Sequence, residues 1–205
     1  MYLVRHGSTD AHSHGIKQSP TTPLSKAGVK QVEDTADWLK KFHTEYLYSS
    51  EWKRAEQTAQ IIAERLGIMC SLRPDVHECS KNPILNGLAA DDPLVLQSYQ
   101  EYRENIDDAD WKFMGDGESV NETIERARKY LDDMAAKHPT NSVVVATHNL
   151  FIGVIVSLIL LWDDYNHKTF MNLKKQLRMD NAGITVIEYS QPTGKWTLKS
   201  FNVIP

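Results

Sequence analysis

The stretch from Ser142 to Thr147 contains three consecutive valines, Val143 to Val145. A strand with one face in water alternates apolar and polar side chains, whereas a continuous β-branched run is typical of a strand covered on both faces. Such strands occur mainly in α/β proteins, in which helices cover both sides of a parallel sheet. The stretch therefore predicts a central strand in a layered α/β fold.

Amphipathic helices and short strands alternate along the rest of the chain. Helices are predicted from the N-cap Ser25 to about Phe42, from the Ser49-Ser50 turn to Gly67, over Leu94–Ile106 and Glu118–Lys137, and from Asn149 through the apolar run Leu150–Trp162. Strands are predicted at Tyr2–Arg5, Tyr46–Tyr48, Ile68–Leu72, Asn181–Tyr189 and Trp196–Val203. Because ligands of such sheets bind at the carboxyl ends of parallel strands, we expect the chemistry just beyond those ends.

Size and charge narrow the class of protein. The chain has 205 residues and a net charge of −4, which fits one domain and excludes a generally basic nucleic-acid binder. The apolar run Leu150–Trp162 is shorter than the ~20 residues of a membrane helix. Cys70 and Cys79 are too few for a disulfide scaffold, although a single bridge between them stays open. No signal peptide is visible, so we expect a cytoplasmic protein without nucleic-acid or membrane partners.

Three polar groups follow predicted strands: Arg5-His6-Gly7, Ser49-Ser50 with Arg54, and Thr147-His148-Asn149. At one edge, their two histidines and two arginines would form a cationic pocket. The planar arginine fork donates two parallel hydrogen bonds to phosphate oxygens. Repulsion by the arginines favours the neutral, nucleophilic form of the first histidine. The second histidine, if protonated, would add a donor to the phosphoryl oxygens.

The same residues stand in longer stretches with a recognisable order. These stretches are Leu3-Val4-Arg5-His6-Gly7-Ser8-Thr9, the segment Pro23-Leu24-Ser25 to Gln31, the segment Ser49-Ser50 to Ala59, Gly117-Glu118-Ser119, Val145-Ala146-Thr147-His148 and Asn181-Ala182-Gly183-Ile184. A single Arg-His-Gly is a weak signal, but an ordered set over nearly the whole chain is specific. The set resembles the motifs of the histidine phosphatase superfamily, also called the phosphoglycerate mutase-like family.

The resemblance implies a fold and a set of roles. The implied fold is a three-layer α/β/α sandwich with a mostly parallel central sheet, in a single domain over residues 1–205. A small lid insertion at about 79–117 would choose the substrate. The resemblance makes His6 the nucleophile that receives a phosphoryl group, in a reaction without metal or cofactor. It assigns phosphate binding to Arg5, Arg54, His148, Gly7 and Thr9.

Glu78 is the best match to the family's proton donor, which protonates the leaving oxygen. A neighbouring phosphate dianion favours the protonated form of a carboxyl, and the resulting carboxylate can then activate water. The residues after Glu78 lack both the Gly, Trp and Glu-Gly pattern of broad-specificity phosphatases and the longer mutase motif. Asp75 and Asp91 are therefore alternative acids, and His77 is either a substrate contact or a solvated loop histidine.

His12 stands where the family usually has a phosphate-binding asparagine. An imidazole can donate one hydrogen bond in place of the amide, so His12 is expected to bind phosphate. His12 and His14 could instead form a metal site with His6. No accompanying Cys or Asp cluster completes such a ligand set, so no metal is expected.

These observations predict a metal-independent phosphatase that hydrolyses a phosphate monoester through a phosphohistidine on His6. The alternatives are phosphoglycerate mutase activity, or a phospho-ligand binding protein of the same fold with little turnover. The expected partner is a small phosphorylated substrate, and the oligomeric state is open, with a homodimer as one alternative. Aromatic and apolar residues of the lid could face the leaving group or cover the core: Tyr99, Tyr102, Trp111, Phe113 and Met114.

Overall fold

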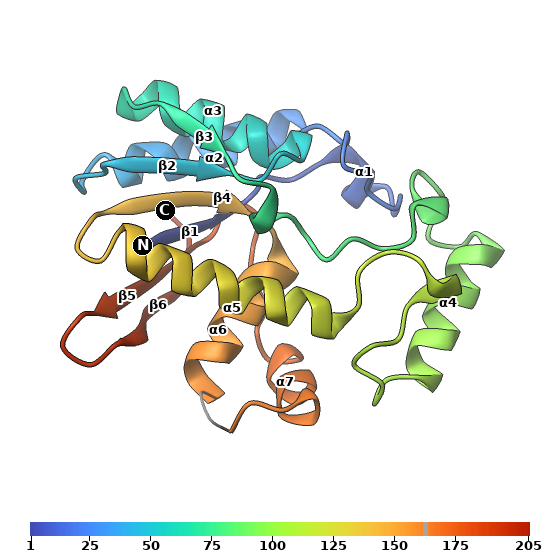
Figure 1. Cartoon of the computed structure of the whole chain (residues 1–205). Coiled ribbons are helices and arrows are strands. Elements are labelled where there is room, and N and C mark those ends of the chain that lie inside the picture. The colour runs from blue at the N-terminus through green and yellow to red at the C-terminus, as the bar shows by residue number, and fades with distance from the viewer. Residues whose placement is uncertain (162–163) are drawn as a thin grey trace.

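A six-stranded sheet forms the middle of the protein, in the order β3-β2-β4-β1-β5-β6 (Figure 1). The structure is a computed structural model and describes residues 1–161 and 164–205. Strands β1 to β4 are parallel to one another, whereas β5 and β6 are antiparallel to their neighbours. The bounds are β1 Tyr2–Arg5, β2 Tyr46–Ser49, β3 Cys70–Leu72, β4 Val143–Thr147, β5 Ile184–Ser190 and β6 Lys195–Val203.

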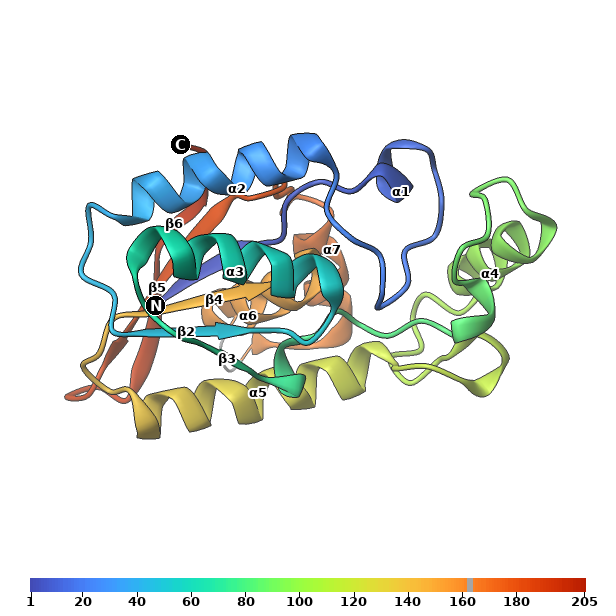
Figure 2. The same cartoon turned by 90° about the horizontal axis from the view of Figure 1, so that it is seen from above.

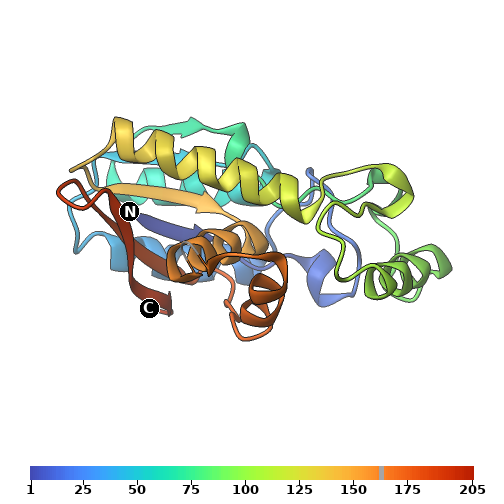
Figure 3. The same cartoon turned by 60° about the horizontal axis from the view of Figure 1, so that its bottom comes forward.

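Helices cover both faces of this sheet, which confirms the three-layer α/β/α arrangement (Figures 2 and 3). Successive strand side chains point to opposite faces. Val144 joins the core under α2 and α3, and Val145 joins the core formed with α5, α6 and α7. Every residue of β4 is buried, as the valine run predicts. The helices are α1 Asp10–Ser13, α2 Lys26–Leu39, α3 Lys53–Leu66, α4 Pro93–Glu104, α5 Val120–Lys137, α6 Asn149–Leu161 and α7 His167–Lys174, with 3₁₀ turns at Pro74–Val76, Pro83–Leu85 and Phe113–Gly115.

The predicted elements are present, with ends that shift by a few residues. Ser25 caps α2 by accepting a hydrogen bond from the N–H of Gly28, and Gly67 ends α3 in the left-handed conformation. The prediction that the helix from Ser25 reaches Phe42 is wrong, because the chain after Leu39 tightens into a turn with bonds to carbonyls three residues back. The sequence does not predict α1 or α7, which have only 4 and 8 residues.

The apolar run is a buried core helix, α6, up to Leu161. Trp162, its predicted end, lies outside the described residues. Among the described residues, no helix combines the length and apolar content that a membrane span requires. Cys70 and Cys79 are both free thiols, so the bridge left open by the sequence is absent.

Segment 79–117 projects beyond the carboxyl ends of the parallel strands (Figures 1 and 2). It contains α4 and a small apolar cluster of its own, built on Leu85, Val95 and Phe113. Tyr102 of the same segment packs against the core on the α5 and α6 side of the sheet. The segment is therefore attached to the main fold, and it flanks the edge of the sheet at which the polar clusters are expected.

Candidate active site

The strand register brings the three polar clusters to one edge of the sheet. Strand β1 pairs with β4 so that Arg5 lies opposite Thr147, and β2 pairs with the other side of β4. The residues that follow these strands, His6, Ser50 and His148, therefore lie next to one another. The rings of His6 and His148 are 5.2 Å apart between centroids.

His6 has one defined tautomer in this arrangement. Its Nδ1 lies 2.8 Å from the carbonyl oxygen of Gly7, which can only accept, so Nδ1 carries the proton. Its Nε2 then has a free lone pair, and this nitrogen accepts a hydrogen bond of 3.1 Å from Nε of Arg54. His6 is only 3% exposed, so the basic nitrogen is held in a dry environment.

The surroundings keep His6 neutral. Burial lowers the pKa of His6 well below its usual value of 6.5, and the positive charges of Arg54, Arg5 and His12 lower it further. The hydrogen bond to Gly7 acts in the opposite direction. The sequence predicts the neutral form from arginine repulsion, and the structure adds burial as the larger cause.

Arg54 lies in the first turn of α3 and is buried. It donates to the carbonyl oxygen of Ser19 over 3.0 Å, and its guanidinium lies 4.8 Å from the centre of the Trp52 ring. Burial lowers the pKa of Arg54 to about 10, with Glu78 opposing this shift and Arg5 adding to it. Arg54 is therefore still a cation at neutral pH.

Two buried nitrogens beside His6 have no hydrogen-bond partner among the described residues. They are Nε of Arg5, whose terminal nitrogen donates to the Met179 carbonyl, and Nδ1 of His148. Buried polar groups without partners are uncommon in folded proteins and need a specific explanation. A ligand with acceptor oxygens would satisfy both nitrogens.

His148 is held by Ser50 and Trp52. Its Nε2 is 2.9 Å from the Ser50 hydroxyl, and its ring meets Trp52 edge-on at 5.1 Å. Burial lowers the pKa of His148 well below 6.5, and the positive charge of Arg54 lowers it further. The resting site thus favours neutral His148 rather than the protonated form considered from the sequence. If the Ser50 hydroxyl donates to Nε2, the remaining proton is on Nδ1, which can donate to a ligand.

Glu78 lies at the start of α6, beside these residues. Its carboxylate oxygens accept hydrogen bonds of 3.1 and 3.2 Å from the backbone N–H groups of Leu150 and Phe151. It also lines the same pocket as Arg54 and is one of the charges that act on it. The other two carboxylates considered from the sequence are elsewhere: Asp75 pairs with Arg73, and Asp91 is exposed and outside this pocket.

The loop after β1 depends on close packing and on Thr9. A Cβ atom added to Gly7 would lie 2.5 Å from the carbonyl oxygen of Gly28, so only glycine allows this approach to α2. The buried Thr9 hydroxyl accepts hydrogen bonds from the N–H of His12 and from Nε2 of Gln18. His12 thereby faces the pocket from α1, where its charge acts on His6.

His12 and His14 do not form a metal site with His6. Nδ1 of His14 bonds to the backbone oxygen of Asp10. Over residues 1–161 and 164–205, no group of three His, Cys, Asp or Glu side chains is placed to hold a metal ion.

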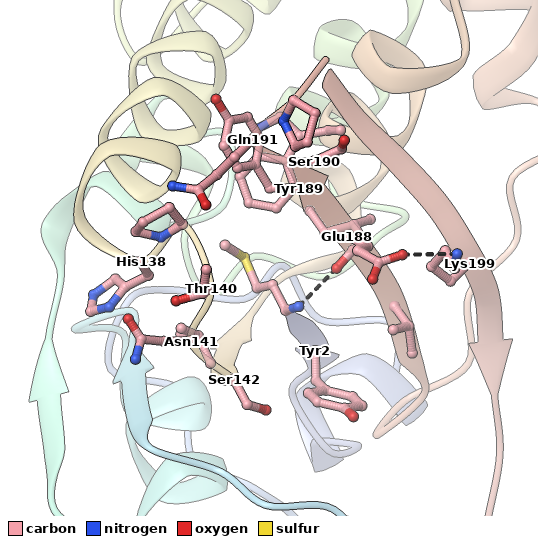
Figure 4. Close-up of a pocket in the computed structure, with 17 residues that line it drawn as sticks. Tyr2, His138, Thr140, Asn141, Ser142, Glu188, Tyr189, Ser190, Gln191 and Lys199 are labelled. Atoms are coloured by element: carbon pink, nitrogen blue, oxygen red, sulfur yellow. Dashed lines mark hydrogen bonds and ion pairs between the residues drawn. The ribbon is translucent and has the colours of Figure 1, made fainter. Parts of the chain in front are cut away.

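The site opens into a pocket of about 460 Å³, between the loop after α1 and the start of segment 79–117. Gln18, Trp52, Arg54 and Glu78 are among its lining residues. A wider hollow of about 760 Å³ lies at the amino ends of β1 and β4, around His138, Asn141 and Tyr189 (Figure 4). That hollow contains none of the predicted site residues.

Sequence reasoning missed Gln18 and Trp52. Gln18 holds Thr9 from a loop without any motif, so nothing in the sequence identifies it. Trp52 stacks on His77 at 5.8 Å and contacts both Arg54 and His148. Its position inside the Ser49-to-Ala59 stretch, two residues before the arginine, is the signal that could have found it.

The fold is shared with solved phosphatase structures. A mycobacterial glucosyl-3-phosphoglycerate phosphatase in complex with VO3 aligns with a TM-score of 0.81 and 23% identity, covering 99% of this chain and 98% of that one. A phosphoserine phosphatase variant from Entamoeba histolytica, in complex with phosphoserine, aligns with a TM-score of 0.78 and 22% identity, covering 99% and 96%. At this level of identity the two structures show a common fold.

Curated relatives and a family model give the classification. A "Probable phosphoglycerate mutase GpmB" from Serratia proteamaculans is 25% identical over 192 residues, which cover 93% of this chain and 85% of the relative. The model of the histidine phosphatase superfamily (branch 1) matches residues 1–204. The match includes the strand-end clusters around His6, Arg54 and His148, as the motif resemblance predicts. The chain therefore belongs to the histidine phosphatase superfamily, branch 1.

Proposed function

We propose that this protein is a phosphatase that hydrolyses a phosphate monoester through a phosphohistidine on His6. The observation that carries the proposal is a neutral His6 whose Nε2 has a lone pair. This nitrogen lies between cationic groups, and some of the hydrogen-bond donors around it are unused. Arg54, Arg5 and His148 would bind the phosphoryl oxygens, with the two unpartnered nitrogens donating to them. Gly7 and Thr9 shape the loop, and His12 adds a donor from α1.

The first step transfers the phosphoryl group to the protein. Nε2 of His6 attacks phosphorus as the bond to the leaving oxygen breaks. Glu78, protonated beside the bound dianion, gives its proton to that oxygen. Arginine forks stabilise the charge that spreads over the equatorial oxygens, so the step needs no metal.

The second step regenerates the enzyme. The Glu78 carboxylate takes a proton from a water molecule, whose oxygen attacks phosphorus while the bond to Nε2 breaks. Inorganic phosphate leaves, and His6 regains its neutral form. The backbone N–H groups of Leu150 and Phe151 hold the side chain of Glu78 in position.

Other parts of the molecule support this reaction. Segment 79–117 borders the pocket through Cys79, Ser80 and Lys81, which supports its role as a lid in one domain over residues 1–205. The two free thiols fit a reducing compartment, and we place the reaction of a small phosphorylated substrate in the cytoplasm.

Mutase activity is the second candidate, because curated relatives are named as probable phosphoglycerate mutases. A mutase must return the phosphoryl group before water attacks, which requires a closed site. The two activities separate when the protein is incubated with p-nitrophenyl phosphate and with 3-phosphoglycerate. Isomerisation of the second compound with little phosphate release would overturn the phosphatase proposal.

A labelling experiment tests the nucleophile. Labelled phosphate from a substrate should appear on the protein in an acid-labile, base-stable form, and the label should be absent from His6→Ala. The exposed His14 provides a matched control, since His14→Ala should label like the wild type. Full turnover by His6→Ala would contradict the proposal, and so would a complete absence of label and turnover in the wild type.

A further inference from the structure

A second cavity adjoins the pocket that is lined by Arg54 and Glu78. It has a volume of about 230 Å³ and shares Lys17, Lys81, Leu85 and Tyr99 with the first pocket. Because four residues line both spaces, a molecule with its phosphate at His6 can extend from one into the other. The second cavity is therefore where part of a leaving group would lie.

Four lysines line this cavity, and one of them, Lys112, pairs with Glu122. The other three come from separate parts of the chain. Lys17 comes from the loop after α1, Lys81 from the start of segment 79–117, and Lys174 from the last turn of α7. None of the three forms an ion pair with a carboxylate among the described residues. Other lysines do form ion pairs with carboxylates, such as Lys30 with Asp34 on α2.

The contacts of these lysines leave their charges available. Lys17 donates to the Tyr99 hydroxyl over 3.2 Å, and Lys81 lies 3.3 Å from the Cys79 sulfur. Lys174 is half-buried and lies 5.9 Å from the centre of the Tyr102 ring. Burial lowers the pKa of Lys174, and the charge of Lys81 lowers it further, whereas Cys79 and the charge of Glu78 act in the opposite direction. A bound anion would offset the two lowering effects.

The carboxylates near the cavity do not neutralise this charge. Glu118 lines the cavity but pairs with Arg126 at 2.8 Å, and Lys112 pairs with Glu122 at 2.7 Å. Asp116 is exposed and accepts a hydrogen bond from the N–H of Gly117. The cavity therefore has an excess of positive charge from Lys17, Lys81 and Lys174.

Most of the remaining cavity wall is apolar or aromatic, with Asn82 and Ser98 as its neutral polar residues. The apolar and aromatic part consists of Leu85, Tyr99, Tyr102, Trp111, Phe113 and Leu150. Met114, considered from the sequence with these residues, is exposed and does not line the cavity. A carbon skeleton fits against such a wall, while a charged group at its end would meet the lysines.

We infer that the substrate carries a second anionic group, on an apolar or aromatic leaving group, and that Lys17, Lys81 and Lys174 bind this group. The inference rests on the proposed function, because it takes the phosphate to lie at His6. The anion is a carboxylate or a second phosphoryl-type group, which share the acceptor oxygens that lysine recognises. Lys17, Lys81 and Lys174 then determine specificity and take no part in the chemical steps.

Matched substrates provide the test. The substrates are 3-(4-phosphooxyphenyl)propanoate, its primary amide, and the analogue with a phosphonate in place of the carboxylate. Their phosphate esters are separated from the varied group by the same ring and chain, so leaving-group chemistry is nearly constant. We expect kcat/KM to be at least about tenfold higher for one or both anions than for the amide. The better anion identifies the group that the cavity takes.

Variants connect this preference to the lysines. In Lys174→Met the ratio of anion to amide kcat/KM should fall toward one, and Lys174→Arg should restore most of it. Lys175→Met is the matched control, because Lys175 is the next residue, is exposed and lines neither space, so it should keep the wild-type ratio. Equal turnover of anions and amide by the wild type, or a ratio unchanged in Lys174→Met, overturns the inference.

Binding measurements test the anion subsite independently of the proposed hydrolysis. Dissociation constants of the acid and the amide are measured by calorimetry on His6→Ala, which cannot form the phosphohistidine. Tighter binding of the acid, lost in His6→Ala with Lys174→Met, supports the anion subsite even if the wild type hydrolyses none of the compounds. Equal binding of acid and amide overturns the subsite even if the wild type hydrolyses both.

Discussion

Nε of Arg54 donates a hydrogen bond of 3.1 Å to Nε2 of His6, the nitrogen that would attack phosphorus. In this state the arginine occupies the lone pair of the nucleophile. A phosphate that enters the site offers the guanidinium better acceptors, since hydrogen bonds to charged oxygens are stronger than those to neutral groups. Substrate binding would then release the lone pair at the moment when it is needed.

Arg54→Gln should weaken phosphate binding and should also change the protonation of His6. We expect kcat/KM to fall by about 10²- to 10³-fold, which is typical for the loss of one donor to transition-state charge. The pKa of His6 should rise toward 6.5, because the charge of Arg54 is the largest lowering cause after burial. Steady-state kinetics and NMR titration of the imidazole measure the two effects.

Arg65 offers the control for this prediction, because it lies on the exposed side of α3 and pairs with Asp37. Arg65→Gln should keep both the activity and the His6 titration. Arg54→Lys, which retains the charge without the fork, guards against a folding defect in Arg54→Gln. Wild-type kcat/KM in both Arg54 variants would contradict the assigned role.

Glu78→Gln should slow turnover according to the leaving group. For an alkyl phosphate, whose leaving oxygen needs a proton, we expect a decrease of about 10²- to 10⁴-fold. For p-nitrophenyl phosphate the first step needs little protonation, so the decrease should be smaller. The measurement is the fold-decrease in kcat for the alkyl phosphate divided by the fold-decrease in kcat for p-nitrophenyl phosphate.

Asp75→Asn is the matched carboxylate control, because Asp75 lies three residues earlier and pairs with Arg73 outside the pocket. It should affect both substrates little. If Glu78→Gln reduced both substrates equally, the proton-donor role would be refuted. If Asp75→Asn alone showed the leaving-group dependence, the acid would be Asp75.

Much of the fold and the centre of the site could be predicted from the sequence. A continuous valine run allows few arrangements other than a strand between two helical layers. Parallel neighbours of that strand must end at the same edge, so residues after Arg5, Ser49 and Thr147 must meet. This is why the positions of His6, Arg54 and His148 follow from strand ends and motifs alone.

Other features depend on tertiary packing that leaves no local pattern. The cavity lysines lie far apart in the chain, and one of them is on α7, a helix of only 8 residues. The neutral state of His148 follows from its complete burial, which a sequence does not display. The short α1 is fixed by its Thr9 cap and by the loop around it rather than by helical propensity.

Gly28 should be essential for stability although it touches no substrate. A Cβ atom at this position would lie 2.1 Å from the backbone oxygen of Ser8, in the loop that follows His6. We expect Gly28→Ala to lower the free energy of unfolding by about 3 kcal/mol, with a drop in Tm of roughly 6 to 12 °C. Urea unfolding and a thermal melt measure these values.

Gly153 gives the opposite expectation for the same substitution. It lies inside α6, and an added Cβ would meet no atom within 4 Å. Gly153→Ala should therefore raise the free energy of unfolding by about 0.5 to 1 kcal/mol, because alanine loses less entropy in a helix. Equal stability of the two variants would show that the close approach of Gly28 to Ser8 is not a constraint.

The two buried histidines should make the protein less stable in mild acid. Their pKa values are lowered in the folded state, so between the folded value and 6.5 the unfolded chain binds more protons. The free energy of unfolding should therefore fall as the pH decreases from about 7.5 to 5.5, by up to about 1.4 kcal/mol per pH unit for each histidine. Urea unfolding at several pH values measures the slope.

His148→Gln should reduce the slope of the free energy of unfolding against pH, whereas His43→Gln, at an exposed position, should preserve it. A slope in His148→Gln equal to that of the wild type would mean that other groups cause the acid sensitivity.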